Sequence, residues 1–286
     1  MLDATWQRRA AIGLGVAGAA AAIAGTRAAA AETGSTWERI RGNKELRIGV
    51  TSGEPWFYKD PASGAWSGIG FAAGQAIAAA LDVKLTPVET SWSNAVAGLQ
   101  ADQFDVMFVL DATPQRALAV DFPVQPFFYY AQGLLVRDGL AAKRWADLDK
   151  PEIRIAVTLG TAPDRDVTAR LPHAHIERFP SNDQTILAFQ SGHVDAVCLY
   201  HPALVLQQHR VGMGKVVLPE PIRASTTSAG VRREADKTWR DWLGLALGFY
   251  YTTGETQQFY EAFLRSRGID PSQAPAVMQE MWTAHG

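Results

Sequence analysis

Apolar runs of strand length alternate with segments of helical pattern from residue 46 onward. In the first half of the chain, the runs that predict strands are LRIGV (46–50), VKLTPV (83–88) and FDVMFVL (104–110). The intervening segments FAAGQAIAAAL (71–81) and AVAGLQ (95–100) predict helices, the second one capped by Ser93 or Asn94. This order of elements is typical of a parallel sheet with crossover helices.

The same alternation restarts at residue 153. Strands are predicted over IRIAV (153–157), HIERF (175–179) and VDAVCLY (194–200), with one helix beginning near Thr161 and another over TILAFQ (185–190). GLQADQFDVMFVL in the first half and AFQSGHVDAVCLY in the second share one pattern, in which Asp105 and Asp195 hold matching places. The sequence therefore predicts an α/β protein of two similar lobes.

Two long strand-like segments connect the predicted lobes. PFFYYAQGLLVR (126–137) would leave the first lobe and ASTTSAGVRR (224–233) would return to it, and two crossings make a hinge possible. Helices predicted over 237–251 and 257–268, and a last one from Pro271 to about Trp282, would pack back on the first lobe. We expect residues 32–134 and 226–286 to form the first lobe, and residues 135–225 the second.

The first 31 residues have the features of an export signal. Arg8-Arg9 precede an Ala/Gly-rich apolar stretch that ends in Ala29-Ala30-Ala31, an A-x-A type of cleavage site. The weak hydrophobicity, and Arg27 near the cut, indicate a twin-arginine signal peptide. Cleavage near Ala31 would release the protein to the periplasm, and export without cleavage, leaving an anchor, is the alternative.

Composition excludes several classes of function. A chain of 286 residues that is 47% hydrophobic and 20% charged is a soluble globular protein, and a net charge of −2 gives no basic field for nucleic acid. Cys198 is the only cysteine, so no intrachain disulfide can form, and its apolar surroundings predict a buried, inert thiol. The Cys198-x-x-His201 spacing is half of a zinc pattern without its second half, and no cofactor motif is present.

Ligands of open α/β sheets bind beyond the carboxyl ends of the strands. Here those ends are the 51–58 loop, the 111–116 turn, and the pairs Gly160-Thr161 and Tyr200-His201. In the stretch DATPQRALAVDF, Thr113 reads as a helix N-cap, Pro114 as the first helical residue and Arg116 as the third. Arg116 is then suited to grip a carboxylate with two parallel hydrogen bonds.

Several segments resemble a known family in the order in which they occur. These are GVTSGEPWFYKDPASGAWSGIGF, SWSNAVAGLQADQFDVMF, ATPQRALAVDFPVQPFFYYAQGLLVR, AVTLGTAPD and SGHVDAV. They are similar to the landmarks of the family 3 periplasmic solute-binding proteins, the amino-acid receptors of ABC importers. The resemblance spans roughly residues 44 to 253. It implies the type II periplasmic binding protein fold, with two crossover strands, a hinge and closure on a ligand.

The resemblance also assigns roles to single residues. Arg116 matches the family's arginine for the ligand α-carboxylate, and Thr161 matches the first of two supporting threonines, with Ala162 in place of the second. Tyr200 stands where the amino-acid receptors usually carry the aspartate that receives the α-ammonium. A phenol with a pKa near 10 is neutral at pH 7 and cannot neutralise an ammonium.

Asp111 is the candidate replacement for that missing carboxylate. It stands where these receptors usually carry Ser or Thr, so Asp111 and Arg116 together could bind a zwitterion from one lobe. The alternative is an internal ion pair between Asp111 and Arg116 that holds the turn and leaves the cleft to another ligand. The predicted ligand contacts are Arg116, Asp111, Thr113, Thr161, Trp56, Trp92 and Tyr200.

The sequence thus predicts a monomeric periplasmic receptor that closes on a small carboxylate ligand, an amino acid or derivative, and delivers it to the membrane permease of an ABC importer. No catalytic residue, metal or cofactor is expected. Some enzymes resemble this fold, notably cyclohexadienyl dehydratases, and in that alternative His201, Glu54 or Asp111 would act as acid or base. A sensor or scaffold whose cleft serves a partner protein is the third reading.

Overall fold

The computed structural model describes residues 34–282, so the predicted signal peptide lies outside the described residues. In the first lobe the three predicted strands are confirmed as β1 (Glu45–Val50), β4 (Lys84–Glu89) and β5 (Met107–Leu110). The predicted helices are confirmed as α2 (Ile69–Leu81) and α3 (Ala95–Gln100). Three further elements are α1 (Thr36–Asn43), β2 (Tyr58–Lys59) and β3 (Trp66–Ser67).

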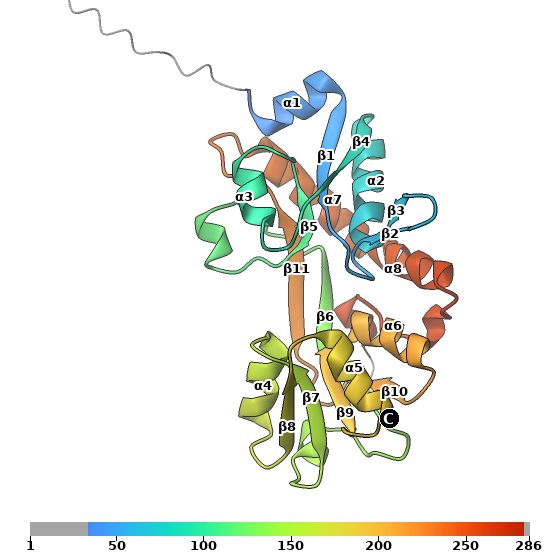
Figure 1. The fold of residues 1–286 in the computed structure, drawn as a ribbon. Coiled ribbons are helices and arrows are strands. Elements are labelled where there is room, and N and C mark those ends of the chain that lie inside the picture. The colour runs from blue at the N-terminus through green and yellow to red at the C-terminus, as the bar shows by residue number, and fades with distance from the viewer. Residues whose placement is uncertain (1–33, 283–286) are drawn as a thin grey trace, which may run out of the picture. The chain divides into compact units, whose positions relative to one another are not determined.

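The second lobe repeats this arrangement (Figure 1). Its predicted strands are β7 (Arg154–Thr158), β8 (His175–Phe179) and β9 (Ala196–Tyr200), and its predicted helices are α4 (Ala162–Arg170) and α5 (Asn182–Gln190). Three elements of this lobe were not predicted, namely η2 (Trp145–Leu148), α6 (His201–Val211) and β10 (Lys215–Val217). Strands β7 and β8, and β7 and β9, pair in parallel, as β1 and β4 do in the first lobe.

Two strands cross between the lobes side by side, β6 (Phe128–Val136) and β11 (Ala224–Gly230) (Figure 1). They are antiparallel, and their register runs from Ala131 opposite Ala224 to Phe128 opposite Thr227. The strand order β5-β11-β6-β9-β7-β8 makes one mixed sheet that reaches into both lobes, with β10 added on β6. The predicted fold class, two α/β lobes joined by two crossover strands, is confirmed.

The hydrophobic interior divides largely by lobe, except that Val205 and Leu206 of α6 belong to the first lobe's core. A large core in the first lobe includes Ile48, Phe104 and Trp239, and two smaller cores cover the opposite faces of the second lobe's sheet around Val157 and Phe189. Helices α7 (Thr238–Thr252) and α8 (Glu255–Ser266) belong to the first of these cores. Among residues 34–282, no helix combines the length and apolar character that crossing a membrane requires.

Two predicted helices are wrong. The segment from Pro271 to Trp282 forms only two 3₁₀ turns, η3 (Pro271–Gln273) and η4 (Gln279–Met281). Pro275 interrupts any helix here because it has no N–H to donate. The chain between the turns is instead held by tertiary hydrogen bonds, since Tyr129 N–H donates to the Val277 carbonyl at 3.0 Å.

The helix expected from Thr113 is a single 3₁₀ turn, η1 (Arg116–Leu118). Thr113 still acts as a cap, because its hydroxyl accepts the Arg116 N–H at 3.3 Å. The turn ends early because Asp121 pairs through its backbone with Val231, in both directions at 3.0 and 2.9 Å. Pairing with a distant segment therefore overrides the local helical signal.

The matching aspartates of the two halves make matching contacts. Asp105 accepts the backbone N–H of Arg47 at 2.7 Å and pairs with its guanidinium at 2.8 Å. Asp195 does the same with Arg154, at 2.9 Å and 2.8 Å. In the first lobe a second guanidinium, from Arg39, also pairs with Asp105. Each aspartate thereby connects two neighbouring parallel strands at their amino ends.

The turn before α4 is held by the buried carboxylate of Asp164. This carboxylate accepts the Gly160 N–H at 2.9 Å and pairs with Arg178 at 2.9 Å. Burial on its own raises the pKa of Asp164, but the Gly160 N–H, Arg178 and Thr168 outweigh it and hold the pKa below its ordinary value. The ionised form therefore stabilises the 158–164 turn.

Asp105→Asn is expected to destabilise the protein by about 3 kcal/mol, because it leaves the partly buried guanidinium groups of Arg39 and Arg47 without their carboxylate. Asp195→Asn should cost much less, because the Asp195 side chain is 22% exposed whereas that of Asp105 is 0% exposed. Urea unfolding followed by circular dichroism measures both. Equal losses of unfolding free energy in the two variants would contradict the larger stabilising role given to Asp105.

Stability should fall in acid. The pKa of Asp164 is lowered in the fold, and so is that of Asp121, where burial opposes the shift and Lys237 and Arg233 outweigh it. A lowered folded pKa contributes stability above the unfolded value of about 3.9, and the contribution is lost as pH falls through the folded value. Urea unfolding at pH values from 7 down to about 2.5 should show this loss, with a shallower dependence in Asp164→Asn. An identical pH dependence would exclude Asp164 as a contributor.

Candidate functional site

A pocket of about 200 Å³ lies where the loops of the first lobe meet the crossing strands and the end of β9. Five of the seven predicted ligand residues line it. Its lining consists of Trp56, Trp92, Val109, Leu110, Asp111, Arg116, Tyr130 and Tyr200. Residues from the ends of β1, β4 and β5 therefore meet a residue of β6 and the last residue of β9, as expected for a site beyond the carboxyl ends of strands.

Arg116 is held in place without an anionic partner. Its Nη1 donates to the Asp111 main-chain carbonyl at 3.0 Å. Arg233 holds the far side of the turn, donating to the Leu118 carbonyl at 3.1 Å and also to that of Ala117. Among the described residues, no carboxylate lies within ion-pair distance of Arg116. Since a guanidinium has five donors, most of them remain for a ligand.

The Asp111 carboxylate is anchored by a tyrosine rather than by Arg116. Its Oδ1 accepts the Tyr130 hydroxyl at 2.7 Å. The internal ion pair considered as an alternative is thus not the geometry found, because Arg116 contacts the main-chain carbonyl of Asp111 and not its carboxylate. One anionic and one cationic group therefore face the same small pocket without neutralising each other directly.

Aromatic rings form the walls around these charges. The rings of Tyr130 and Tyr200 lie 4.2 Å apart, and Trp56 lies 5.9 Å from Tyr130 and stacks at 5.6 Å on the buried ring of Phe128. Burial, and then the charge of Asp111, raise the pKa of both tyrosines, so both hydroxyls stay protonated at neutral pH. Tyr200 is consequently a neutral group in the pocket, as its identity predicts.

A β-bulge at Val109 turns the chain into the pocket. Leu110 pairs with Ser228 and Phe108 with the next residue, Ala229, so that Val109 has no partner on β11. Val109 has a φ of 60°, which is unusual for a β-branched residue. Bulges re-aim side chains next to functional sites. The bulge sets the direction in which the chain continues to Asp111.

Thr113 and Thr161 lie outside the pocket lining. The Thr113 hydroxyl accepts the Arg116 N–H. Thr161 is the N-cap of α4, where its hydroxyl accepts the Asp164 N–H at 3.3 Å and donates to the Thr158 carbonyl at 2.6 Å. The Thr113 hydroxyl therefore supports the 111–116 turn that lines the pocket, whereas the Thr161 hydroxyl supports the 158–164 turn, which contributes no lining residue.

Two of the three acid or base candidates of the enzyme reading are placed away from the pocket. His201 is fully buried, its Nδ1 accepts the Ala131 N–H at 3.0 Å, and burial lowers its pKa to about 3. Glu54 forms an ion pair with Arg267 at 3.2 Å. Of the three candidates, only Asp111 lines the pocket. Cys198 is buried as predicted, and burial raises its pKa to about 12.

Of the lining residues, Val109, Leu110 and Tyr130 were not predicted, and Tyr130 is the one whose side chain contacts Asp111. The segment 126–137 was assigned to a crossing strand, and alternation along a strand puts Tyr130 and Tyr129 on opposite faces. The pattern contains no signal for which of the two faces the pocket. The structure places Tyr130 on Asp111, while Tyr129 packs against Tyr251 at 5.6 Å.

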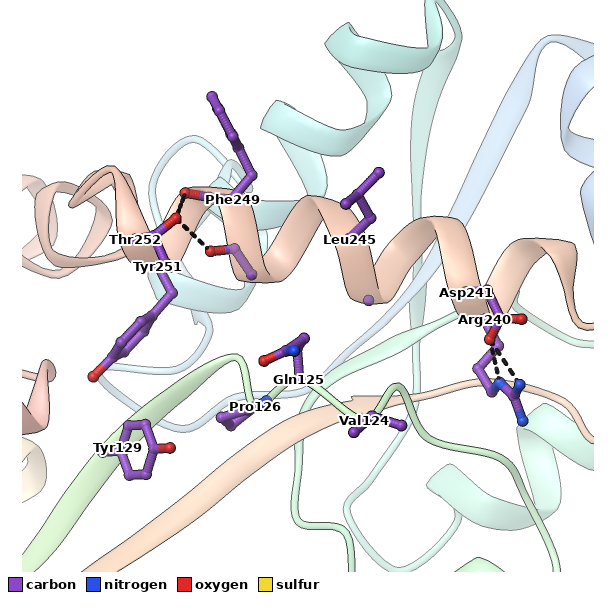
Figure 2. Close-up of a pocket in the computed structure, with 12 residues that line it drawn as sticks. Val124, Gln125, Pro126, Tyr129, Arg240, Asp241, Leu245, Phe249, Tyr251 and Thr252 are labelled. Carbon is purple, nitrogen blue, oxygen red and sulfur yellow. Dashed lines mark hydrogen bonds and ion pairs between the residues drawn. The ribbon is translucent and has the colours of Figure 1, made fainter.

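A larger pocket of about 670 Å³ lies on the other face of β6, between the 124–126 segment and α7. Figure 2 shows its lining, in which Arg240 and Asp241 pair with each other at 2.7 Å. Its wall residues include the exposed Val124 and Leu245, which are 94% and 74% exposed. The two charged residues of its lining, Arg240 and Asp241, pair with each other, so the smaller pocket, with its separate Asp111 and Arg116 charges, is the better candidate for the functional site.

Comparison with solved structures places the fold among amino-acid-binding proteins. An ancestral cationic amino acid solute-binding protein is 28% identical with a TM-score of 0.69, over 80% of this chain and 99% of that chain. A proposed binding component of an ABC transporter from Wolinella succinogenes DSM 1740, complexed with lysine, is 26% identical with a TM-score of 0.63, over 77% and 95%. An ancestral cyclohexadienyl dehydratase at 23% identity and a TM-score of 0.58, over 81% and 97%, shares the fold.

The sequence itself also matches a family model. A search of curated proteins finds no match. The model for bacterial extracellular solute-binding proteins, family 3, matches residues 46–266. This span contains both crossing strands and every residue of the pocket. The chain therefore belongs to the bacterial extracellular solute-binding proteins of family 3.

Proposed function

We propose that the protein is a periplasmic receptor that binds a small zwitterion, an amino acid or a derivative of one, and delivers it to an ABC importer. Arg116 grips the carboxylate and Asp111 faces the cationic nitrogen. The observation that carries this proposal is the meeting of these two charged groups in one aromatic pocket without an ion pair between them: the Arg116 guanidinium is held by the Asp111 main-chain carbonyl, and the Asp111 carboxylate by the Tyr130 hydroxyl.

The neighbours support this choice of ligand class. Solute-binding structures that are 28% and 26% identical are those of a cationic amino acid binding protein and of a protein complexed with lysine. Those ligands belong to those proteins, but they share the carboxylate and the cationic nitrogen that Arg116 and Asp111 suit. The predicted twin-arginine signal, cleaved near Ala31, would export the receptor to the periplasm. There it could deliver its ligand to the membrane permease.

Closure would use the crossing strands. We propose that residues 32–134 with 226–286, and residues 135–225, move as two bodies about β6 and β11. Tyr200 comes from the second lobe, whereas Asp111 and Arg116 come from the first. A ligand that touches all three stabilises the closed arrangement by its differential contacts, which is the requirement for ligand-driven closure. Thr161 and the α4 turn would complete the second lobe's side.

Arg116→Ala should weaken binding of every carboxylate ligand by at least about 100-fold, because two charge-assisted hydrogen bonds are lost. A thermal-shift screen of amino acids, amines, dicarboxylates and aromatic carboxylates identifies the ligand, and calorimetry then measures the affinity. Arg240→Ala is the matched control, since that arginine lies at the other pocket and should leave affinity unchanged. Unchanged affinity in Arg116→Ala would refute the assignment.

Asp111→Asn should remove the preference for ligands with a cationic nitrogen over the same carboxylates without one.

Tyr130→Phe keeps the ring but removes the hydroxyl that orients Asp111. Because one charge-assisted hydrogen bond is lost, we expect about 10-fold weaker binding of the zwitterion. Binding of the carboxylate that lacks nitrogen should not change. Tyr129→Phe, on the opposite face of β6, is the control, and an equal effect in both tyrosine variants would exclude a role for the Tyr130 hydroxyl.

A further inference from the structure

Aromatic side chains make up a large part of the pocket lining. Four of its eight lining residues are aromatic, namely Trp56, Trp92, Tyr130 and Tyr200. Both tryptophans lie close to Gly53, where an added Cβ would meet Trp92 Nε1 at 3.6 Å and Trp56 Cδ1 at 3.9 Å. Phe128 covers one face of Trp56 at an interplanar angle of 17°, which fixes the ring. Aromatic faces gathered around one position attract a cation through the ring quadrupole.

The anionic group of the pocket is already partly engaged. Asp111 Oδ1 accepts the Tyr130 hydroxyl, and the Asp111 main-chain carbonyl accepts from Arg116. A primary ammonium has three N–H donors, and each one that is buried without an acceptor costs free energy. A fully methylated ammonium carries the same charge without any N–H donor. It requires a nearby negative charge and ring faces, which this pocket supplies.

The size of the pocket points the same way. At about 200 Å³ it is smaller than the roughly 300–1,000 Å³ of pockets that hold drug-sized ligands. A short molecule in which the carboxylate and the cationic nitrogen are close together fits between Arg116 and Asp111, which are themselves joined by one hydrogen bond. A long side chain beyond the α-carbon has little room.

We propose that the cationic end of the ligand is a methylated ammonium, held by Asp111 inside a cage of Trp56, Trp92, Tyr130 and Tyr200. The ligand class is therefore small betaines, that is, carboxylates with a quaternary nitrogen, in preference to unmodified amino acids. This inference rests on the proposed function, because it takes Arg116 as the carboxylate site. Tyr200 then contributes to binding, because it offers a ring face to the cation at the position where the family usually carries an aspartate.

Calorimetric titration of the full chain with glycine, N-methylglycine, N,N-dimethylglycine and trimethylglycine tests the inference. Affinity should rise along the series and reach at least a 10-fold preference for trimethylglycine over glycine. The neutral isostere 3,3-dimethylbutanoate separates charge from shape, because it has the carboxylate and the bulk but no positive charge. It should bind at least 10-fold more weakly than trimethylglycine.

Two variants test the cage. Trp56→Ala should weaken trimethylglycine binding at least 10-fold, while Trp56→Phe, which keeps a ring, should retain most of the affinity. Tyr200→Asp supplies acceptor oxygens in place of a ring, so it should shift the preference toward glycine. Circular dichroism and thermal unfolding of each variant report whether the fold is kept, and the ratio of the two ligands within one variant does not depend on total stability.

The outcomes separate this inference from the function on which it rests. Falling or constant affinity along the methylation series, or equal binding of the neutral isostere, overturns the betaine assignment. If primary amino acids bind tightly and Arg116→Ala abolishes that binding, the receptor function stands and the betaine class is wrong. If no carboxylate in either series binds, both proposals fail.

Discussion

The antiparallel ladder between β6 and β11 is the constraint on which the rest of the structure depends. β11 pairs with β5 on one side and β6 pairs with β9 on the other, so the ladder orders the strands that carry the pocket. Asp111 follows β5, Tyr130 lies within β6 and Tyr200 ends β9. The register of the ladder thus sets the relative heights of these three side chains. Any slip by one residue would exchange Tyr130 for Tyr129 at the carboxylate.

Much of the fold can be predicted from the pattern of apolar residues and from the spacing of the predicted strands and helices along the chain. Strands β1, β5, β7 and β9 were predicted because buried strands are continuous apolar runs. The shared pattern around Asp105 and Asp195 reflects a shared contact with an arginine on the neighbouring strand. The failures have tertiary causes. The turn after Thr113 ends at a backbone pairing with Val231, and the chain beyond Pro271 is held by Tyr129, partners that no local pattern reveals.

The residues of the candidate site could be predicted where the type of side chain and its position just after a strand indicate its role. Arg116, Asp111, Trp56, Trp92 and Tyr200 were expected at strand ends and line one pocket. Tyr130 and the bulge at Val109 were not predicted, because each depends on which face of a strand meets a distant element. The choice between an Asp111–Arg116 ion pair and two separate groups likewise depends on tertiary contacts, since both arrangements fit the same spacing in the sequence.

The solitary cysteine has a practical consequence. Cys198 is buried in β9 and its thiol resists ionisation, so it is a poor target for reagents that require a thiolate. Because the chain contains no other cysteine, a pair introduced on the surfaces of the two lobes would accept spin labels or fluorophores without competition. Distances between such probes would follow the movement of one lobe against the other in the otherwise native protein.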